Sequence, residues 1–261
     1  MTTSLFRDAA GTLSSGVRAA LLLSLVLILA GCDARQGKPA RSRLILWAWE
    51  RPEDLRFHPD ADIAIQTGFI EIRGDALKAR GRYFPLRSTK RPSTALVHVQ
   101  IDHSEPLRWS PALRAQLAAA IHFYATATPA PRVQLDFEVR KSERQILLQA
   151  LTDLRRALPP KTELSITALA SWCMDDDWLQ SAPVDEIVPM LFRMQKDGPA
   201  IIKTLADGGD FRNPRCRAAV AISSDSPIAR AQPGRRVYLF NPRSWTQQSF
   251  RRAQHVVEAW R

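Results

Sequence analysis

Short apolar runs recur along most of the chain, and turn-forming or amphipathic stretches separate them. Runs of this length, rich in Val, Ile and Leu, are typical of buried strands. We predict eight strands, at residues 44–50, 62–67, 96–102, 133–139, 163–169, 186–192, 217–223 and 236–242. A further run within residues 68–84 predicts a small hairpin or a loop decoration.

Apolar residues at three- and four-residue spacing fill several gaps between these strands, which predicts helices. The helical stretches are residues 111–126, 142–158, 176–182, 198–209 and 249–260. Ser110 is the expected N-cap of the first helix, with Pro111 at its first position, and Ser142 is the expected N-cap of the second.

Strands that alternate with helices indicate a parallel sheet covered by helices. Eight strands within residues 44–261 fit an α/β fold, a (β/α)8 TIM-like barrel built as a single domain with short loops. A doubly wound open sheet is the alternative. The sequence has neither a GxGxxG nor a GxxxxGK[ST] phosphate loop, and this favours the barrel.

Two consecutive predicted strands carry polar residues at every second position. These positions are His98, Gln100 and Asp102 in the first strand and Gln134, Asp136 and Glu138 in the second. Alternate residues share one face of a strand, and a strand of a parallel barrel is normally apolar on both faces. Because unpaired buried charges are costly, we predict that the polar faces line a functional site. An antiparallel sheet with one solvated face is the alternative, and the predicted helices argue against it.

Asp136 and Glu138 are the candidate catalytic residues. Residues i and i+2 of a strand lie roughly 6.6–7 Å apart, so repulsion between the two carboxylates favours a protonated Glu138. A protonated Glu is suited to act as a general acid on a glycosidic oxygen. The spacing therefore predicts carboxylate acid/base chemistry on a glycan.

The stretch QLDFE resembles the Asp-x-Asp-x-Glu motif on strand four of the family 18 glycoside hydrolases, which are (β/α)8 barrels. The resemblance implies that Glu138 is the acid and that Asp136 is its partner. The chain departs from the motif at Gln134, where the family has its first Asp, and around Phe192 and Arg193, where the family has a Tyr on strand six. Both departures argue against the chitinase-type mechanism, in which the N-acetyl group of the substrate is the nucleophile.

A second resemblance spans nearly the whole chain after residue 43. The stretches WAWERPEDL, VQLDFE, SITALASWC, DEIVPMLFRM and YLFNPRSW resemble a bacterial lipoprotein family described as "domain of unknown function 3142". This resemblance implies a barrel related to glycosidases and does not imply a substrate.

Tryptophans near the ends of predicted strands are candidates for stacking against sugar rings. They are Trp47, Trp49, Trp172 and Trp245, and ordinary packing in the core or at the rim is the alternative for each. The other candidate substrate-binding residues are Glu50, Asp102, Gln134, Met190 and Arg193.

Several of these polar candidates have a structural alternative. Glu50 would otherwise form an exposed ion pair with Arg51 or Arg193. Arg193 would bind an anionic group or neutralise Asp136, and a structural ion pair is its alternative. Asp102 would otherwise pair with His98, for which a structural role is favoured because His98 lies early in its strand.

The charge of the chain bears on its partners. It carries 37 basic and 26 acidic residues, a net charge of +11. The basic residues are spread out without a block of five, which favours loose attraction to anionic lipid or cell-wall polymer over nucleic-acid binding. No CxxC or HxxxH spacing occurs, and the acidic run 175–177 is interpreted as a helix cap, so we predict no metal site and no cofactor.

Residues 1–31 have the pattern of a bacterial lipoprotein signal peptide. Basic residues precede an apolar run at residues 19–30, which is too short to span a membrane comfortably. LAGC resembles a lipobox, which implies lipidation of Cys32. The residues after it are polar with Gly and Pro, which predicts a tether over residues 32–43. The domain would then face the periplasm of a bacterial envelope, and Asp33 resembles a signal for retention in the inner membrane. An uncleaved N-terminal anchor is the alternative.

If Cys32 carries lipid, Cys173 and Cys216 are left in an oxidising compartment. A disulfide between them is predicted, and two buried free thiols are the alternative.

Two functions fit this sequence. One is an envelope-anchored glycoside hydrolase that acts on a polysaccharide or cell-wall glycan, and Asp136 and Glu138 favour it. The other is a lectin-like barrel that binds such a glycan without turnover, and the two departures from the family 18 motif favour it.

Overall fold

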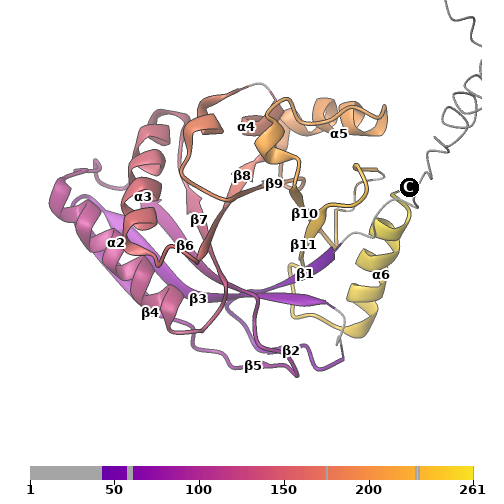
Figure 1. Cartoon of the computed structure of the whole chain (residues 1–261), viewed down its shortest axis with the longest axis horizontal. Coiled ribbons are helices and arrows are strands. Elements are labelled where there is room, and N and C mark those ends of the chain that lie inside the picture. The colour runs from indigo at the N-terminus through magenta and orange to yellow at the C-terminus, as the bar shows by residue number, and fades with distance from the viewer. Residues whose placement is uncertain (1–42, 58–60, 175, 227, 229, 261) are drawn as a thin grey trace, which may run out of the picture. The chain divides into compact units, whose positions relative to one another are not determined.

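The structure is a computed structural model that describes residues 43–57, 61–174, 176–226, 228 and 230–260. Eight parallel strands close into a (β/α)8 barrel, because β1 pairs with β3 on one side and with β11 on the other (Figure 1). The barrel strands, in spatial order, are β1 (Arg43–Ala48), β3 (Asp62–Arg73), β6 (Thr94–Asp102), β7 (Arg132–Glu138), β8 (Glu163–Leu169), β9 (Glu186–Met190), β10 (Ala219–Ser223) and β11 (Arg236–Phe240). The predicted fold is confirmed.

All eight predicted strands are present, and β3 differs most from its prediction. It continues past residue 67 to Arg73, and β4 (Ala76–Gly81) pairs with it in an antiparallel hairpin. Gly74 turns the hairpin with a φ of 59°, a conformation that glycine adopts without steric cost. The predicted hairpin is therefore an extension of the second barrel strand. Two short strands, β2 (Glu53–Asp54) and β5 (Leu86–Arg87), pair with each other outside the barrel.

Helices cover much of the outside of the barrel (Figure 1). They are α2 (Pro111–Thr126), α3 (Arg144–Ala157), α4 (Ala170–Met174), α5 (Gly198–Ala206) and α6 (Gln247–Glu258). Between α6 and α2 the outer layer consists of β2, β5 and loops (Figure 1). In the described part of the chain, no helix of the structure is long and apolar enough to cross a membrane.

The helix starts follow the predicted capping signals only in part. The Ser110 side chain accepts a hydrogen bond from the backbone N–H of Leu113, and Pro111 opens α2, as predicted. The prediction for Ser142 is wrong. A 3₁₀ turn, η1 (Lys141–Glu143), precedes α3, so Ser142 lies inside that turn and Glu143 is the N-cap residue.

The interior of the barrel below the cavity contains a buried polar network. The Trp47 indole N–H donates to the side-chain oxygen of Gln134 (2.8 Å), and the Gln134 amide donates to the Ser165 hydroxyl (3.0 Å). The Ser165 and Tyr238 hydroxyls both donate to one oxygen of Glu186, at 2.7 and 2.8 Å. Because every member has a partner, the network stabilises a core that would otherwise hold an isolated carboxylate.

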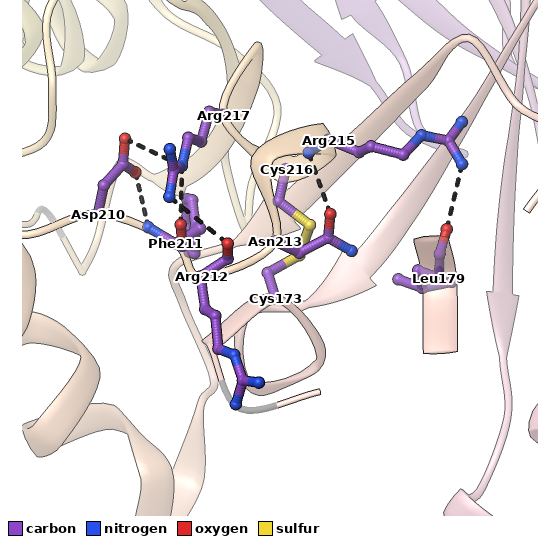
Figure 2. Close-up of a disulfide and its surroundings, with 9 residues drawn as sticks. All are labelled: Cys173, Leu179, Asp210, Phe211, Arg212, Asn213, Arg215, Cys216 and Arg217. Atoms are coloured by element: carbon purple, nitrogen blue, oxygen red, sulfur yellow. Dashed lines mark hydrogen bonds and ion pairs between the residues drawn. A yellow bond between two sulfur atoms is a disulfide. The ribbon is translucent and has the colours of Figure 1, made fainter. Parts of the chain in front are cut away.

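Cys173 in α4 and Cys216 in the 3₁₀ turn η4 (Pro214–Cys216) form a disulfide (Figure 2). The adjoining backbone is also fixed, since the N–H of Asn213 donates to the carbonyl of Cys173. Both cysteines are fully buried. Of the two alternatives for this pair, the structure contains the bond. The predicted leader, the lipidation site Cys32 and the tether up to residue 42 lie outside the described residues.

Candidate active site

An open cavity of about 940 Å³ lies at the carboxyl ends of the barrel strands. Its wall comes from the ends of β1, β3, β6, β7, β8, β9 and β11, with contributions from β4 and α4. Enzymes with this fold place their catalytic residues at this end of the barrel. The two polar strand faces of the sequence, on β6 and β7, both contribute to the wall.

A row of side chains crosses the cavity floor at one level of the sheet. Strand pairing places Phe69 beside His98 and His98 beside Asp136. The rings of Phe69 and His98 stack at 5.3 Å. Nδ1 of His98 lies 2.7 Å from Oδ2 of Asp136, and the Thr167 hydroxyl donates to Oδ1 of Asp136 at 2.5 Å. Both oxygens of the Asp136 carboxylate are therefore engaged, and its orientation is fixed.

The pairing with Asp136 shifts the protonation equilibrium of His98. Burial lowers the pKa of the imidazole, but the hydrogen bond and charge of Asp136, together with the charge of Glu138, outweigh it. The pKa of His98 is therefore raised above its usual value. The imidazolium form of His98 is therefore more favourable beside Asp136 than it is for a free imidazole.

Glu138 is the last residue of β7, and its environment differs from that of Asp136. Its side chain is exposed and borders the cavity. Within the described residues it has no salt bridge and no side-chain hydrogen bond. The three polar residues on this face of β7 thus lie at three depths, with Gln134 in the core, Asp136 in the floor and Glu138 open to the cavity.

Aromatic rings form a second part of the wall. Phe192 and Phe240 stack in parallel at 5.3 Å, and Trp49 packs edge-on against Phe240 at 6.0 Å. Trp172, from α4, also borders the cavity. Flat apolar faces beside carboxylates suit the binding of a sugar ring, whose C–H faces pack on aromatic rings.

The charged pairs around the cavity differ from those predicted. Glu50 pairs with Arg80 of β4 at 2.9 Å and not with Arg51 or Arg193. Asp102 lies 3.8 Å from Arg73 and does not pair with His98, which binds Asp136 instead. The predicted pairing of His98 with Asp102 is wrong because the register of β6 and β7 places His98 directly beside Asp136.

Eight predicted site residues border the cavity, and three do not. The eight are Trp49, Glu50, Asp102, Asp136, Glu138, Trp172, Met190 and Arg193. The other three, Trp47, Gln134 and Trp245, are buried outside its wall. Gln134 and Trp47 belong to the polar network of the core, and the Trp245 indole donates to the backbone carbonyl of Trp47. The structure does not support substrate contact by these three residues.

Several wall residues were missed from the sequence. Phe69 and Arg80 lie in the stretch interpreted as a hairpin decoration, and Thr167 and Phe240 carried no signal beyond ordinary strand residues. The polar alternation of β6 includes His98, but the early position of this residue in the strand favours a structural role. Among the described residues, no group of three or more His, Cys, Asp or Glu side chains is arranged to hold a metal ion.

No family model matches the chain, and no curated protein sequence matches it significantly. Membership of the family described as domain of unknown function 3142 therefore stays a prediction. Among solved structures, the chain is similar to the chitinase domain of the spore coat protein CotE from Clostridium difficile, with 11% sequence identity and a TM-score of 0.42. The match covers 74% of this chain and 66% of that one, slightly less than two thirds of its length.

Proposed function

We propose that the cavity binds a glycan and that the protein hydrolyses one of its glycosidic bonds, with Glu138 as the acid and base. The position of Glu138 carries this proposal. It is an exposed carboxyl group at the end of a barrel strand, it has no salt bridge to any residue that the structure describes, and aromatic rings border the same cavity.

The proposed reaction uses Glu138 twice. As a carboxylic acid it protonates the bridging oxygen while the bond from that oxygen to the anomeric carbon breaks. As a carboxylate it then accepts a proton from the water whose oxygen bonds to the anomeric carbon. Asp136, held by His98 and Thr167, is the positioning residue that keeps negative charge next to Glu138.

A specific observation favours a second candidate, glycan binding without turnover. Both oxygens of Asp136 are engaged, and Gln134, at the position of the first Asp in the family 18 motif, is fully buried. Neither residue is then available to assist an N-acetyl nucleophile. A barrel with this floor would retain the aromatic wall and recognise a sugar chain without cleaving it.

The test uses the full-length protein, a Glu138→Gln variant and a Glu105→Gln control, since Glu105 is an exposed acid outside the cavity wall. Each is incubated with bacterial and chitin-type glycans while new reducing ends are counted. Release by the wild type and the control, but not by Glu138→Gln, supports the hydrolase. Glycan binding with no release by any of the three supports the second candidate.

We also propose that the domain functions outside the cytoplasm, anchored to the bacterial envelope through lipidated Cys32. The disulfide between Cys173 and Cys216 supports this, because disulfides persist in oxidising compartments and are rare in the cytosol. We further propose that Asp33 retains the lipidated protein in the inner membrane.

A further inference from the structure

Most charged side chains around the cavity already have an opposite charge beside them. Arg80 pairs with Glu50, and Arg51 pairs with Glu53 at 3.1 Å. Arg193 differs from both. It is exposed, it borders the cavity, and within the described residues it has no salt bridge and its guanidinium makes no hydrogen bond. Its charge is therefore available to a ligand.

The guanidinium of Arg193 is nevertheless held in place. Its central carbon lies 5.4 Å from the centre of the Phe240 ring, and Phe240 stacks on Phe192. A cation over an aromatic face is attracted by the ring without losing its charge. The Arg193 backbone has a φ of 54°, in the left-handed region that non-glycine residues rarely adopt. Strained backbone of this kind is concentrated at functional sites.

A small side chamber adjoins the main cavity at Arg193. Its volume is about 180 Å³, and it shares Leu169, Met190, Phe192 and Arg193 with the main cavity. At roughly 30 Å³ per water molecule, this is room for about six waters, which suits a substituent rather than a whole polymer. The rest of the wall mixes apolar side chains, such as Met194 and Ile201, with one cation, Lys196, and one acid, Asp197.

The charged groups of the cavity are therefore arranged asymmetrically. Asp136 and Glu138 lie on β7 and are followed by the exposed Arg140, whereas Arg193 and Lys196 follow β9 without a catalytic carboxylate on that strand. A glycan that crosses the cavity meets two carboxylates and the Arg140 cation on the β7 side, and the Arg193 cation on the β9 side. A negative group on the part of the glycan that lies by β9 would be complementary to Arg193.

We propose that Arg193 and the side chamber bind a carboxylate-bearing substituent of the glycan, so that the substrates belong to the acidic glycans. The planar guanidinium matches a carboxylate in a two-bond geometry, and the apolar wall accommodates the carbon atoms that carry the group. This inference rests on the proposed function, because it names the class of glycan that the same cavity takes.

The test measures binding of matched glycans to the full-length protein by calorimetry. The probes are peptide-free peptidoglycan strands, hyaluronan and alginate, each compared with its carboxyl-reduced form, in which an alcohol replaces the carboxylate. The variants are Arg193→Gln, Arg193→Lys and the control Arg251→Gln, since Arg251 is an exposed arginine on α6 outside the cavity. The wild type and the control are expected to bind at least one native glycan about tenfold more tightly than its reduced form.

Arg193→Gln is expected to lose this preference and to bind the reduced glycan as the wild type does, which also shows that the variant is folded. Arg193→Lys is expected to retain only part of it. Equal affinity of the wild type for all native and reduced forms would overturn this inference and leave glycan binding intact. An undiminished preference in Arg193→Gln would overturn the assignment to Arg193. No binding to any glycan, charged or neutral, would overturn the proposed function together with the inference.

Discussion

His98 and Asp136 are direct neighbours across β6 and β7, and Nδ1 of His98 lies 2.7 Å from Oδ2 of Asp136. The side chains are about 10% and 9% exposed, so water screens their interaction only weakly. The pair has two consequences. It fixes Asp136 in the cavity floor, and it makes the stability of the barrel depend on the protonation of one histidine.

We predict that the pair stabilises the fold most at acidic to neutral pH. The pKa of folded His98 is raised, so its contribution is fully present below the unfolded pKa of about 6.5 and is lost as pH rises through the folded pKa. His98→Gln should reduce the free energy of unfolding by about 2 kcal/mol at pH 6. Urea unfolding of both proteins from pH 5.5 to 9 checks this.

His122→Gln is the control for this series, because His122 lies on α2, away from the cavity floor. The gap between His98→Gln and the wild type should narrow as pH rises, while His122→Gln should show no such trend. A gap that stays constant from pH 5.5 to 9 would show that the imidazolium form is not the stabilising one.

We predict that Glu186 is among the most sensitive positions for stability. Its carboxylate is buried and accepts hydrogen bonds from Ser165 and Tyr238, and Nε of Arg236 lies 2.8 Å from its other oxygen. Glu186→Ala removes the acceptor of the two hydroxyls and leaves Arg236 with the more distant Glu163, 4.0 Å away, so the free energy of unfolding should fall by about 3 kcal/mol or more. Denaturant unfolding at pH 7 measures the change.

Glu163 offers the matched control, because it pairs with Arg132, which also approaches Glu186. The Glu163 side chain is half exposed, so water screens its charge, and its removal leaves the buried Arg132 with Glu186 as a partner. Glu163→Ala should therefore cost much less than Glu186→Ala. Similar losses in the two variants would show that the burial of Glu186 does not increase its contribution to the free energy of unfolding.

The barrel was predictable because most strands are compact apolar runs, the other two alternate regularly, and the intervening stretches have helical spacing. The extension of β3 was not, because Gly68 interrupts its run and resembles a turn. The structure gives the physical reason for this glycine. A Cβ at Gly68 would lie 2.6 Å from the Cβ of Tyr124, so α2 can pack on β3 only where the side chain is absent. Ending the strand at residue 67 concealed Phe69 in the cavity floor.

The sequence predicts which face of β7 contributes to the candidate site, but not how far along the barrel axis each residue lies. Alternation along β7 correctly grouped Gln134, Asp136 and Glu138 on one face. The position of a residue along the barrel axis decides whether its side chain is buried in the core or borders the cavity, and the alternation does not give this position. The same limit applies to Trp47 and Trp245, because an indole that packs in the core and one that stacks on a sugar occupy similar positions near strand ends.

We predict that the disulfide contributes about 4 kcal/mol to the free energy of unfolding, from the entropy of closing a loop with a sequence separation of 43 residues. The double variant Cys173→Ala/Cys216→Ala should unfold at a correspondingly lower denaturant concentration. The reduced wild type, with its thiols alkylated after unfolding, provides the second comparison. Equal stability of the oxidised wild type and the double variant would contradict the prediction.

We predict that Cys32→Ala prevents membrane anchoring without altering the barrel. Cys32 is the residue that the lipobox resemblance assigns to lipidation, and a lipid anchor requires its thiol. In a bacterial host that processes lipoproteins, the wild type should incorporate labelled fatty acid and sediment with membranes. Cys32→Ala should do neither.

Two further measurements on the same strains test the role of Asp33 and the redox state of the disulfide. Separation of inner from outer membranes tests whether Asp33 retains the wild type in the inner membrane, and Asp33→Ser should then move it to the outer one. Thiol alkylation of intact spheroplasts reports on Cys173 and Cys216, which should be oxidised in every variant if the domain faces the periplasm. Reduced cysteines in the wild type would place the barrel in the cytosol and remove the support that the disulfide gives to export.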